Sequence, residues 1–281
     1  RTLMFSATVP RAIADLAKTF QRDALRLVAT SAGEQHADSE YQQVVVRNDG
    51  LAAAHELSSY VLSHNFGDTL RRYHEHYHDK IAHGPSEHRG DGIASAHDIV
   101  RFKHPISVED IVPDTLPRAL WLDELDGSAI TDYSQAVGQL AFAHANITKT
   151  YTLDGATATV TWQLTGLAGR RFTTSLNLAM PSCDGFLGHY TLADGHIPGG
   201  FGQALHLDAA NTLHLDDGVL GGRLSLNMSK LAEISGRLQQ TVSQSEAGFE
   251  KIMQAVELRL GWTIPDDSCT LTLQLNIEPR P

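Results

Sequence analysis

The sequence has little cysteine, no long apolar run and fewer basic than acidic residues. Two of its 281 residues are cysteines, Cys183 and Cys269, and they do not form a C-x-x-C pair. This argues against a disulfide framework or a cysteine zinc knuckle, so we expect two reduced thiols that pack in the interior. No stretch approaches the ~20 apolar residues of a membrane-spanning helix, and no leader-peptide pattern opens the sequence. We therefore expect no membrane partner and a cytoplasmic location.

The charge is distributed unevenly. Residues 1–50 carry six basic and six acidic residues, whereas residues 51–281 carry 16 and 27 and hold the whole net charge of -11. Binding to nucleic acid needs a clustered basic surface, so this charge argues against a nucleic-acid partner and favours a neutral one such as a polysaccharide. Together with the patterns below, it predicts three regions, 1–50, 51–114 and 115–281.

The first region has an α/β pattern, in which a short apolar strand precedes a helix that begins near Pro10 and continues an apolar stripe from Ile13. Its residues 2–10, TLMFSATVP, resemble DEAD-box RNA helicases around their Ser-Ala-Thr motif. The resemblance implies that Ser6 and Thr8 couple nucleotide hydrolysis to strand separation, so an ATP-dependent RNA helicase fragment is one alternative function. The sequence contains no G-x-x-x-x-G-K-[ST] phosphate loop, however, so these residues lack the means to hold ATP. The other interpretation is a strand and helix that only pack.

The second region is rich in histidine, with nine of the 15 histidines between His55 and His104. An apolar stripe from Leu70 to Ile81 predicts a helix that ends at Gly84-Pro85.

On this helix the letters from His74 to His78 satisfy H-E-x-x-H, the pattern that supplies two zinc ligands and a general base in zinc peptidases. A zinc-dependent hydrolase that uses His74, Glu75 and His78 is therefore a second alternative function. The extended motif fails, because Ile81 and Gly84 stand where a glycine and a third histidine would be. The competing interpretation is a solvated histidine-rich helix without a metal, and the leading hypothesis includes no cofactor.

From about residue 115 the apolar period changes to two, which predicts an antiparallel β-sandwich. The turn Asp154-Gly155 predicts a hairpin whose second strand carries Trp162 at an inward position. Other Asp-Gly pairs, at 184–185, 194–195 and 217–218, predict turns rather than calcium sites. The echo of Leu205-His206-Leu207-Asp208 at residues 213–216 predicts two adjacent strands. The polar segment 241–254 is expected to interrupt the alternation.

That polar segment, read with Trp262, resembles the C-terminal domain of glycoside hydrolase family 57 enzymes, the alpha-amylase and 4-alpha-glucanotransferase type. The strings at 70–78, 95–102 and 172–179 support the resemblance, which covers residues 55–279. It implies a large sandwich of the galactose mutarotase-like kind that packs against a catalytic barrel and contacts α-glucan or maltooligosaccharide. It also implies that the two catalytic carboxylates lie on that barrel, so we expect no activity from this chain alone.

The leading hypothesis is thus a non-catalytic, C-terminal accessory domain of such an enzyme: a mainly β fold with α/β and helical segments before the sandwich. Trp162, Gln244, Glu246 and Glu250 are the candidate carbohydrate-binding residues. The alternation also places Trp162 in the core, and the two interpretations compete. Glu246 and Glu250 would share one face of a helical turn, or would satisfy backbone amides where strands cross.

Overall fold

The computed structural model describes residues 71, 75–85, 100–115, 120–136, 140–154, 157–180, 182–183, 186–219, 221–245 and 247–279. The chain divides into two units, Arg1–Glu34 and Gln35–Pro281, and all described residues belong to the second. The helicase-like segment and its predicted strand and helix therefore lie outside the described residues.

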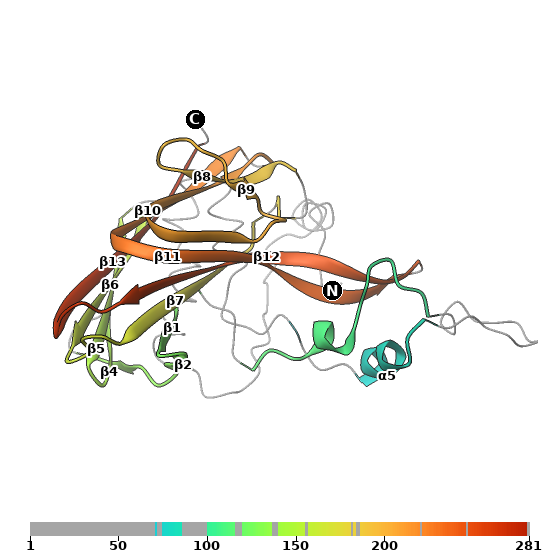
Figure 1. The fold of residues 1–281 in the computed structure, drawn as a ribbon, viewed down its shortest axis with the longest axis horizontal. Helices are drawn as coiled ribbons and strands as arrows, with labels where there is room; N and C mark the ends of the chain where they lie inside the picture. Colours follow the sequence, from blue (N-terminus) through green and yellow to red (C-terminus); the bar gives the residue numbers. More distant parts are fainter. Residues whose placement is uncertain are drawn as a thin grey trace, which may run out of the picture. The chain divides into compact units, whose positions relative to one another are not determined.

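The described part begins with helical elements and continues as antiparallel strands (Figure 1). The helical elements are α5 (Glu75–His83) and the 3-10 turn η1 (Val108–Ile111). The strands are β1 (Leu122–Leu125), β2 (Ser128–Ala129), β3 (Ser134–Gln135), β4 (Ala141–His144), β5 (Ile147–Asp154), β6 (Thr157–Thr165), β7 (Arg171–Leu178), β8 (Gly188–Leu192), β9 (Gly199–Gly200), β10 (Leu205–Asp217), β11 (Gly222–Ser245), β12 (Gly248–Thr263) and β13 (Ser268–Pro279). The predicted fold class is confirmed. No helix within these described ranges is long and apolar enough to cross a membrane.

The strands form one continuous sheet that folds back on itself. The strand order is β2-β1-β7-β12-β11-β13-β6-β5-β4-β3. A branch leaves this order at β11: β10 pairs with β11, β8 pairs with β10, and β9 pairs with β8. β11 pairs with β13 over residues 222–228 and with β12 over residues 233–245. It therefore leaves one layer of the sandwich and enters the other near residue 230.

Aromatic side chains fill the space between the layers. The ring centroid of Trp162 on β6 lies 5.6 Å from that of Phe172 on β7 and 6.5 Å from that of Trp262 on β12. Along the sheet, β6 and β7 are separated by three strands, so this proximity shows that the two layers face each other. The predicted alternation of β6 is confirmed, because Ala158, Val160, Trp162 and Leu164 are all buried.

The predicted local features are largely confirmed. α5 ends at His83, and Gly84, at φ +76°, donates its N–H to the Ile81 carbonyl. β5 and β6 form the hairpin predicted at Asp154. Both cysteines are free and buried, as expected.

The aspartates of two Asp-Gly pairs cap their own turns. Asp194 accepts the His196 N–H, and Asp217 accepts the Val219 N–H, each through Oδ1 at 2.9 Å. The pair at 184–185 lies outside the described residues.

One prediction about β10 is wrong. The echoing strings belong to one 13-residue strand, β10, because bulges between Leu207 and Thr212 bend the strand without ending it. The polar segment 241–254 interrupts the alternation of buried and exposed residues, as predicted, because residues 241–245 and 250–254 are all half-buried. It forms the end of the β11–β12 hairpin, where Ser245 pairs with Gly248.

Candidate functional site

Two of the predicted carbohydrate-binding residues, Gln244 and Glu250, lie near the end of the β11–β12 hairpin and contact the segments that carry α5 and η1, which we call the helical region. The Gln244 backbone N–H donates to the Tyr77 hydroxyl at 3.3 Å, and Lys103 Nζ lies 2.6 Å from Glu250 Oε2. The hydrogen bond from Lys103 lowers the pKa of Glu250. Glu250 lies on a strand, so the helical-turn option is wrong, while Glu246 lies outside the described residues. A carbohydrate role for Gln244, Glu246 and Glu250 stays a prediction.

Phe249 is the centre of this contact. It is fully buried, and its ring packs edge-on against Tyr77 and Phe102, with centroids 5.1 and 5.9 Å away. Its N–H donates to the Arg101 carbonyl at 2.7 Å, and its own carbonyl accepts the Lys103 N–H at 2.8 Å. The segment that most specifically supports the family resemblance therefore attaches the helical region to the hairpin.

Trp162 is a core residue and not a sugar platform. Its side chain is fully buried, and its indole N–H donates to Asp123 Oδ2 at 2.9 Å. A sugar needs an exposed ring face for stacking, which this residue does not offer. The core interpretation of the alternation is thus the correct one.

The metal hypothesis gains no support from the described residues. Among them, no three His, Cys, Asp or Glu side chains are placed to hold a metal ion. His78 is half exposed, with Nδ1 4.0 Å from the Asp79 carboxylate. His74 lies outside the described residues, so the complete H-E-x-x-H motif stays untested.

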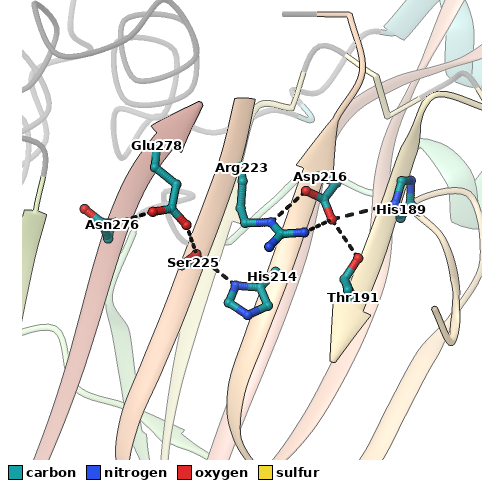
Figure 2. Close-up of polar contacts among 8 residues, drawn as sticks. All are labelled: His189, Thr191, His214, Asp216, Arg223, Ser225, Asn276 and Glu278. Atoms are coloured by element: carbon teal, nitrogen blue, oxygen red, sulfur yellow. Dashed lines mark hydrogen bonds and ion pairs between the residues drawn. The ribbon is translucent and has the colours of Figure 1, made fainter. Parts of the chain in front are cut away.

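A polar network that the sequence did not reveal covers the outer side of β8, β10, β11 and β13, and we call it the polar face. Strand pairing aligns its members in two rows, which Figure 2 shows. The first row is Thr191, His214, Ser225 and Asn276, and the second is His189, Asp216, Arg223 and Glu278. The intervening residues, Tyr190, Leu215, Leu224 and Ile277, are buried in the core, so the same alternation that builds the core points these polar side chains outward.

Asp216 anchors the second row. Its carboxylate accepts both Nε and Nη2 of Arg223, at 2.8 and 2.9 Å, and the Thr191 hydroxyl at 2.6 Å. Burial acts to raise the pKa of Asp216, but the hydrogen bonds from Arg223 and Thr191 outweigh it and hold the pKa below its usual value. The hydrogen bonds to Asp216 also raise the pKa of Arg223. Both groups are thus fixed in their charged forms.

His214 and Ser225 of the first row form a contact with the Glu278 carboxylate of the second row, but not in the order of a hydrolase triad. His214 Nδ1 lies 2.8 Å from Ser225 Oγ, and Ser225 Oγ donates to Glu278 Oε1 at 3.2 Å. The serine hydroxyl has a single proton, which it donates to Glu278. His214 must therefore donate the Nδ1 proton to Ser225 Oγ. In a triad the histidine lies between the acid and the serine and accepts the serine proton. The arrangement therefore fixes hydrogen-bonding groups without activating a nucleophile.

His214 is suited to accept a hydrogen bond from a ligand. Burial and the nearby Arg223 charge lower its pKa, which keeps the ring neutral at physiological pH. With Nδ1 donating to Ser225, the other ring nitrogen is an acceptor. Together with the carboxylate of Glu278 and the amide of Asn276, it presents groups that hydrogen-bond hydroxyls.

Asp216 should contribute to stability only while its carboxyl group is ionised. Because its pKa is lowered in the folded protein, this contribution is present above the ordinary value of 3.8 and is lost as the pH falls through the folded-state pKa. We expect Asp216→Asn to be less stable than wild type at neutral pH, with a smaller difference well below the ordinary carboxyl pKa. Urea unfolding at both pH values measures this, and an equal difference at both would contradict it.

The sequence held one signal for the polar face. The echo of Leu-His-Leu-Asp at 213–216 marks His214 and Asp216 as outward residues of an alternating strand. Their partners, however, come from strands whose register no local pattern gives.

Comparison with known proteins yields one family. The family model described as alpha-amylase/4-alpha-glucanotransferase, C-terminal, matches residues 31–136 and 133–275. The match begins before residue 55, where the resemblance was expected to start. No curated protein matches the chain.

Ten chains of solved structures match this chain, and two of them illustrate the extent of the similarity. A 4-alpha-glucanotransferase from Thermococcus litoralis is 17% identical with a TM-score of 0.44, over 62% of this chain and 30% of that one. The Slr1438 protein from Synechocystis sp. PCC 6803 is 13% identical with a TM-score of 0.30, over 48% and 55%. The matched part thus spans less than a third of the glucanotransferase.

Proposed function

This chain belongs to the family of alpha-amylase/4-alpha-glucanotransferase C-terminal domains, and from that premise we propose that it holds an α-glucan chain for a glucan-processing catalytic domain. It is a C-terminal accessory domain. In this proposal the polar face is the surface that contacts the glucan, and a catalytic barrel, as a domain or a separate chain, is its partner.

The observation that carries the proposal is the pair of polar rows across four strands. Glucose units present hydroxyl groups that both donate and accept hydrogen bonds. His214, Asn276 and Glu278 offer acceptors and an amide donor, and all three are only partly buried. Their bonds to Ser225, Thr157 and one another fix their orientation before a ligand arrives. Groups oriented in advance lose less entropy on binding.

The charge of the polar face also suits a neutral ligand. Arg223 is its one basic residue apart from the histidines, and Asp216 holds it in a bidentate pair. Glu278 adds a negative charge that favours the charged form of Arg223. A surface of this kind has no excess positive charge with which to attract phosphate groups.

Catalysis by this chain alone is not part of the proposal. Retaining glycoside hydrolysis needs a general acid whose pKa is raised and a second carboxylate about 5 Å away. The carboxyl groups of Asp110, Asp126, Asp216 and Glu250 all have lowered pKa values. These four groups would be ionised at neutral pH and unable to donate the proton.

Calorimetry with maltoheptaose tests the binding surface. We expect wild type to bind, and we expect His214→Ala and Asn276→Ala each to weaken the affinity by about tenfold, since each removes a hydrogen bond to a hydroxyl. Thr270→Ala is the matched control, because Thr270 is exposed on the same side of β13, six residues from Asn276.

The control should bind like wild type. An absence of heat with wild type at millimolar maltoheptaose would refute glucan binding altogether. Equal affinities for wild type and both polar-face variants would refute the polar face as the contact surface.

A further inference from the structure

A hollow that shares no residue with the polar face lies where β11 passes from one layer of the sandwich to the other. It has a volume of about 250 Å³, and Arg171, Lys230, Leu231, Glu233 and Trp262 are among its lining residues. Three irregularities meet there. β11 has left β13 after Met228 and joins β12 only at Glu233, and β10 is bulged between Leu207 and Ala210. The sheet therefore leaves space at this point instead of closing over its core.

The rim of the hollow holds charged side chains of both signs. Arg171 and Lys230 supply two positive charges, and Asp208 and Glu233 supply two negative ones. Arg171 Nη2 lies 2.6 Å from Glu233 Oε2. A balanced rim of planar donors and acceptors favours a neutral ligand with several hydroxyls over an anion or a cation.

Part of the lining of the hollow is apolar. Leu231, Trp262 and Leu271 contribute to it, and of these Leu231 is 64% exposed whereas Trp262 and Leu271 are almost fully buried. The Trp262 indole N–H points to this region, since it donates to the Lys230 carbonyl at 3.3 Å. The hollow therefore combines oriented polar groups with one exposed apolar side chain.

Gly261 makes room for this arrangement. A Cβ at this position would collide with Arg171 Nη2, so the guanidinium that lies across β12 and pairs with Glu233 would have to shift. The backbone of Gly261 has no left-handed φ, so its conformation would accept alanine. The glycine is thus explained by the position of Arg171 and not by the backbone.

We propose that this hollow binds one hexose unit, with Arg171 and Glu233 contacting neighbouring hydroxyls and Leu231 contacting the apolar C–H groups of the ring. The identification of that hexose as glucose in an α-glucan rests on the proposed function. The hollow itself uses no residue of the polar face.

Nuclear magnetic resonance of the full chain with maltose tests this site. The chain has three tryptophans, so it gives three indole N–H signals; the Trp262 indole N–H donates to Lys230 at the hollow, whereas the Trp162 indole N–H donates to the buried Asp123. We expect a saturable shift of the Trp262 signal and none of the Trp162 signal. Gly261→Ala should displace the Arg171 guanidinium and weaken the maltose affinity read from this shift by about tenfold.

Gly202→Ala is the matched control, because a Cβ at Gly202 meets nothing within 4 Å. It should titrate like wild type. An absent Trp262 shift with maltose, or equal affinities for wild type and Gly261→Ala, would overturn the proposal. A Trp262 response that persists in Asn276→Ala would support the hollow even if the polar face binds no glucan, so the two proposals can fail separately.

Discussion

Replacing Asp123 by alanine should lower the free energy of unfolding by about 3–5 kcal/mol, the loss that follows when one partner of a buried ion pair is removed. Asp123 and Lys149 are both buried, with Lys149 Nζ 2.9 Å from Asp123 Oδ2. The same oxygen accepts the Tyr133 hydroxyl at 2.8 Å and the Trp162 indole N–H at 2.9 Å. The substitution would thus deprive a buried ammonium and two buried donors of the carboxylate they share.

The remaining contacts of Lys149 should not compensate for the loss. Its ammonium donates to the Trp121 carbonyl at 2.8 Å and lies 5.2 to 5.9 Å from the ring centroids of Tyr133, Tyr151 and Trp162. Cation–π contacts are each worth about 2 kcal/mol when desolvated, but a ring face does not carry the full negative charge of the Asp123 carboxylate that is removed. The ammonium would remain inside the sandwich without the carboxylate that balances it.

Urea unfolding of Asp123→Ala and of Asp132→Ala measures this effect. Asp132 also pairs with a basic side chain, His144, but its own side chain is 69% exposed, and exposed pairs contribute about 0–1 kcal/mol. The double variant Asp123→Leu/Lys149→Met removes both charges and should recover part of the loss. Equal unfolding free energies for Asp123→Ala and Asp132→Ala would show that the buried pair is not important for stability.

The sequence predicted what depends on local pattern. The inward residues of β6, the hairpin at Asp154 and the end of α5 at Gly84 each follow from a few consecutive residues, and all are observed. Lys149 was missed although it lies on β5 between the buried residues Ile147 and Tyr151, on the same side of the strand. Such a lysine signals a buried charge, but its partner Asp123 is 26 positions away on β1.

The polar face could not be predicted for the same reason. Ser225 links His214 to Glu278, which is 53 residues further along the chain, and only the pairing of β10, β11 and β13 brings them together. The polar segment 241–254 stood out in the sequence, but its meaning depended on partners far away. Tyr77 is 167 residues from Gln244, so the attachment of the helical region to this segment could not be predicted from a local pattern.

Gly248→Ala should detach that helical region while leaving the sandwich folded. Gly248 has φ +116°, a conformation that residues with a side chain rarely adopt, and a Cβ there would lie 2.4 Å from the Arg101 carbonyl oxygen. Because the obstacle is backbone, relief requires the 101–103 segment to move, which breaks the two backbone hydrogen bonds of Phe249. We expect a local loss of at least about 2 kcal/mol from strain and broken contacts.

Hydrogen exchange measures this loss residue by residue. The amides of Phe249, Lys103 and α5 should exchange faster in Gly248→Ala, because Phe249 packs against Tyr77 of α5 and pairs with the 101–103 segment. The amides of β6 and β13 should keep their protection, since these strands pair with each other and not with the hairpin end. Gly195→Ala is the matched control, with a similar positive φ but no atom within 4 Å of its Cβ position, so it introduces backbone strain without the collision. Unchanged exchange in α5 of Gly248→Ala, or equal acceleration there in Gly195→Ala, would show that the hairpin end does not hold the helical region.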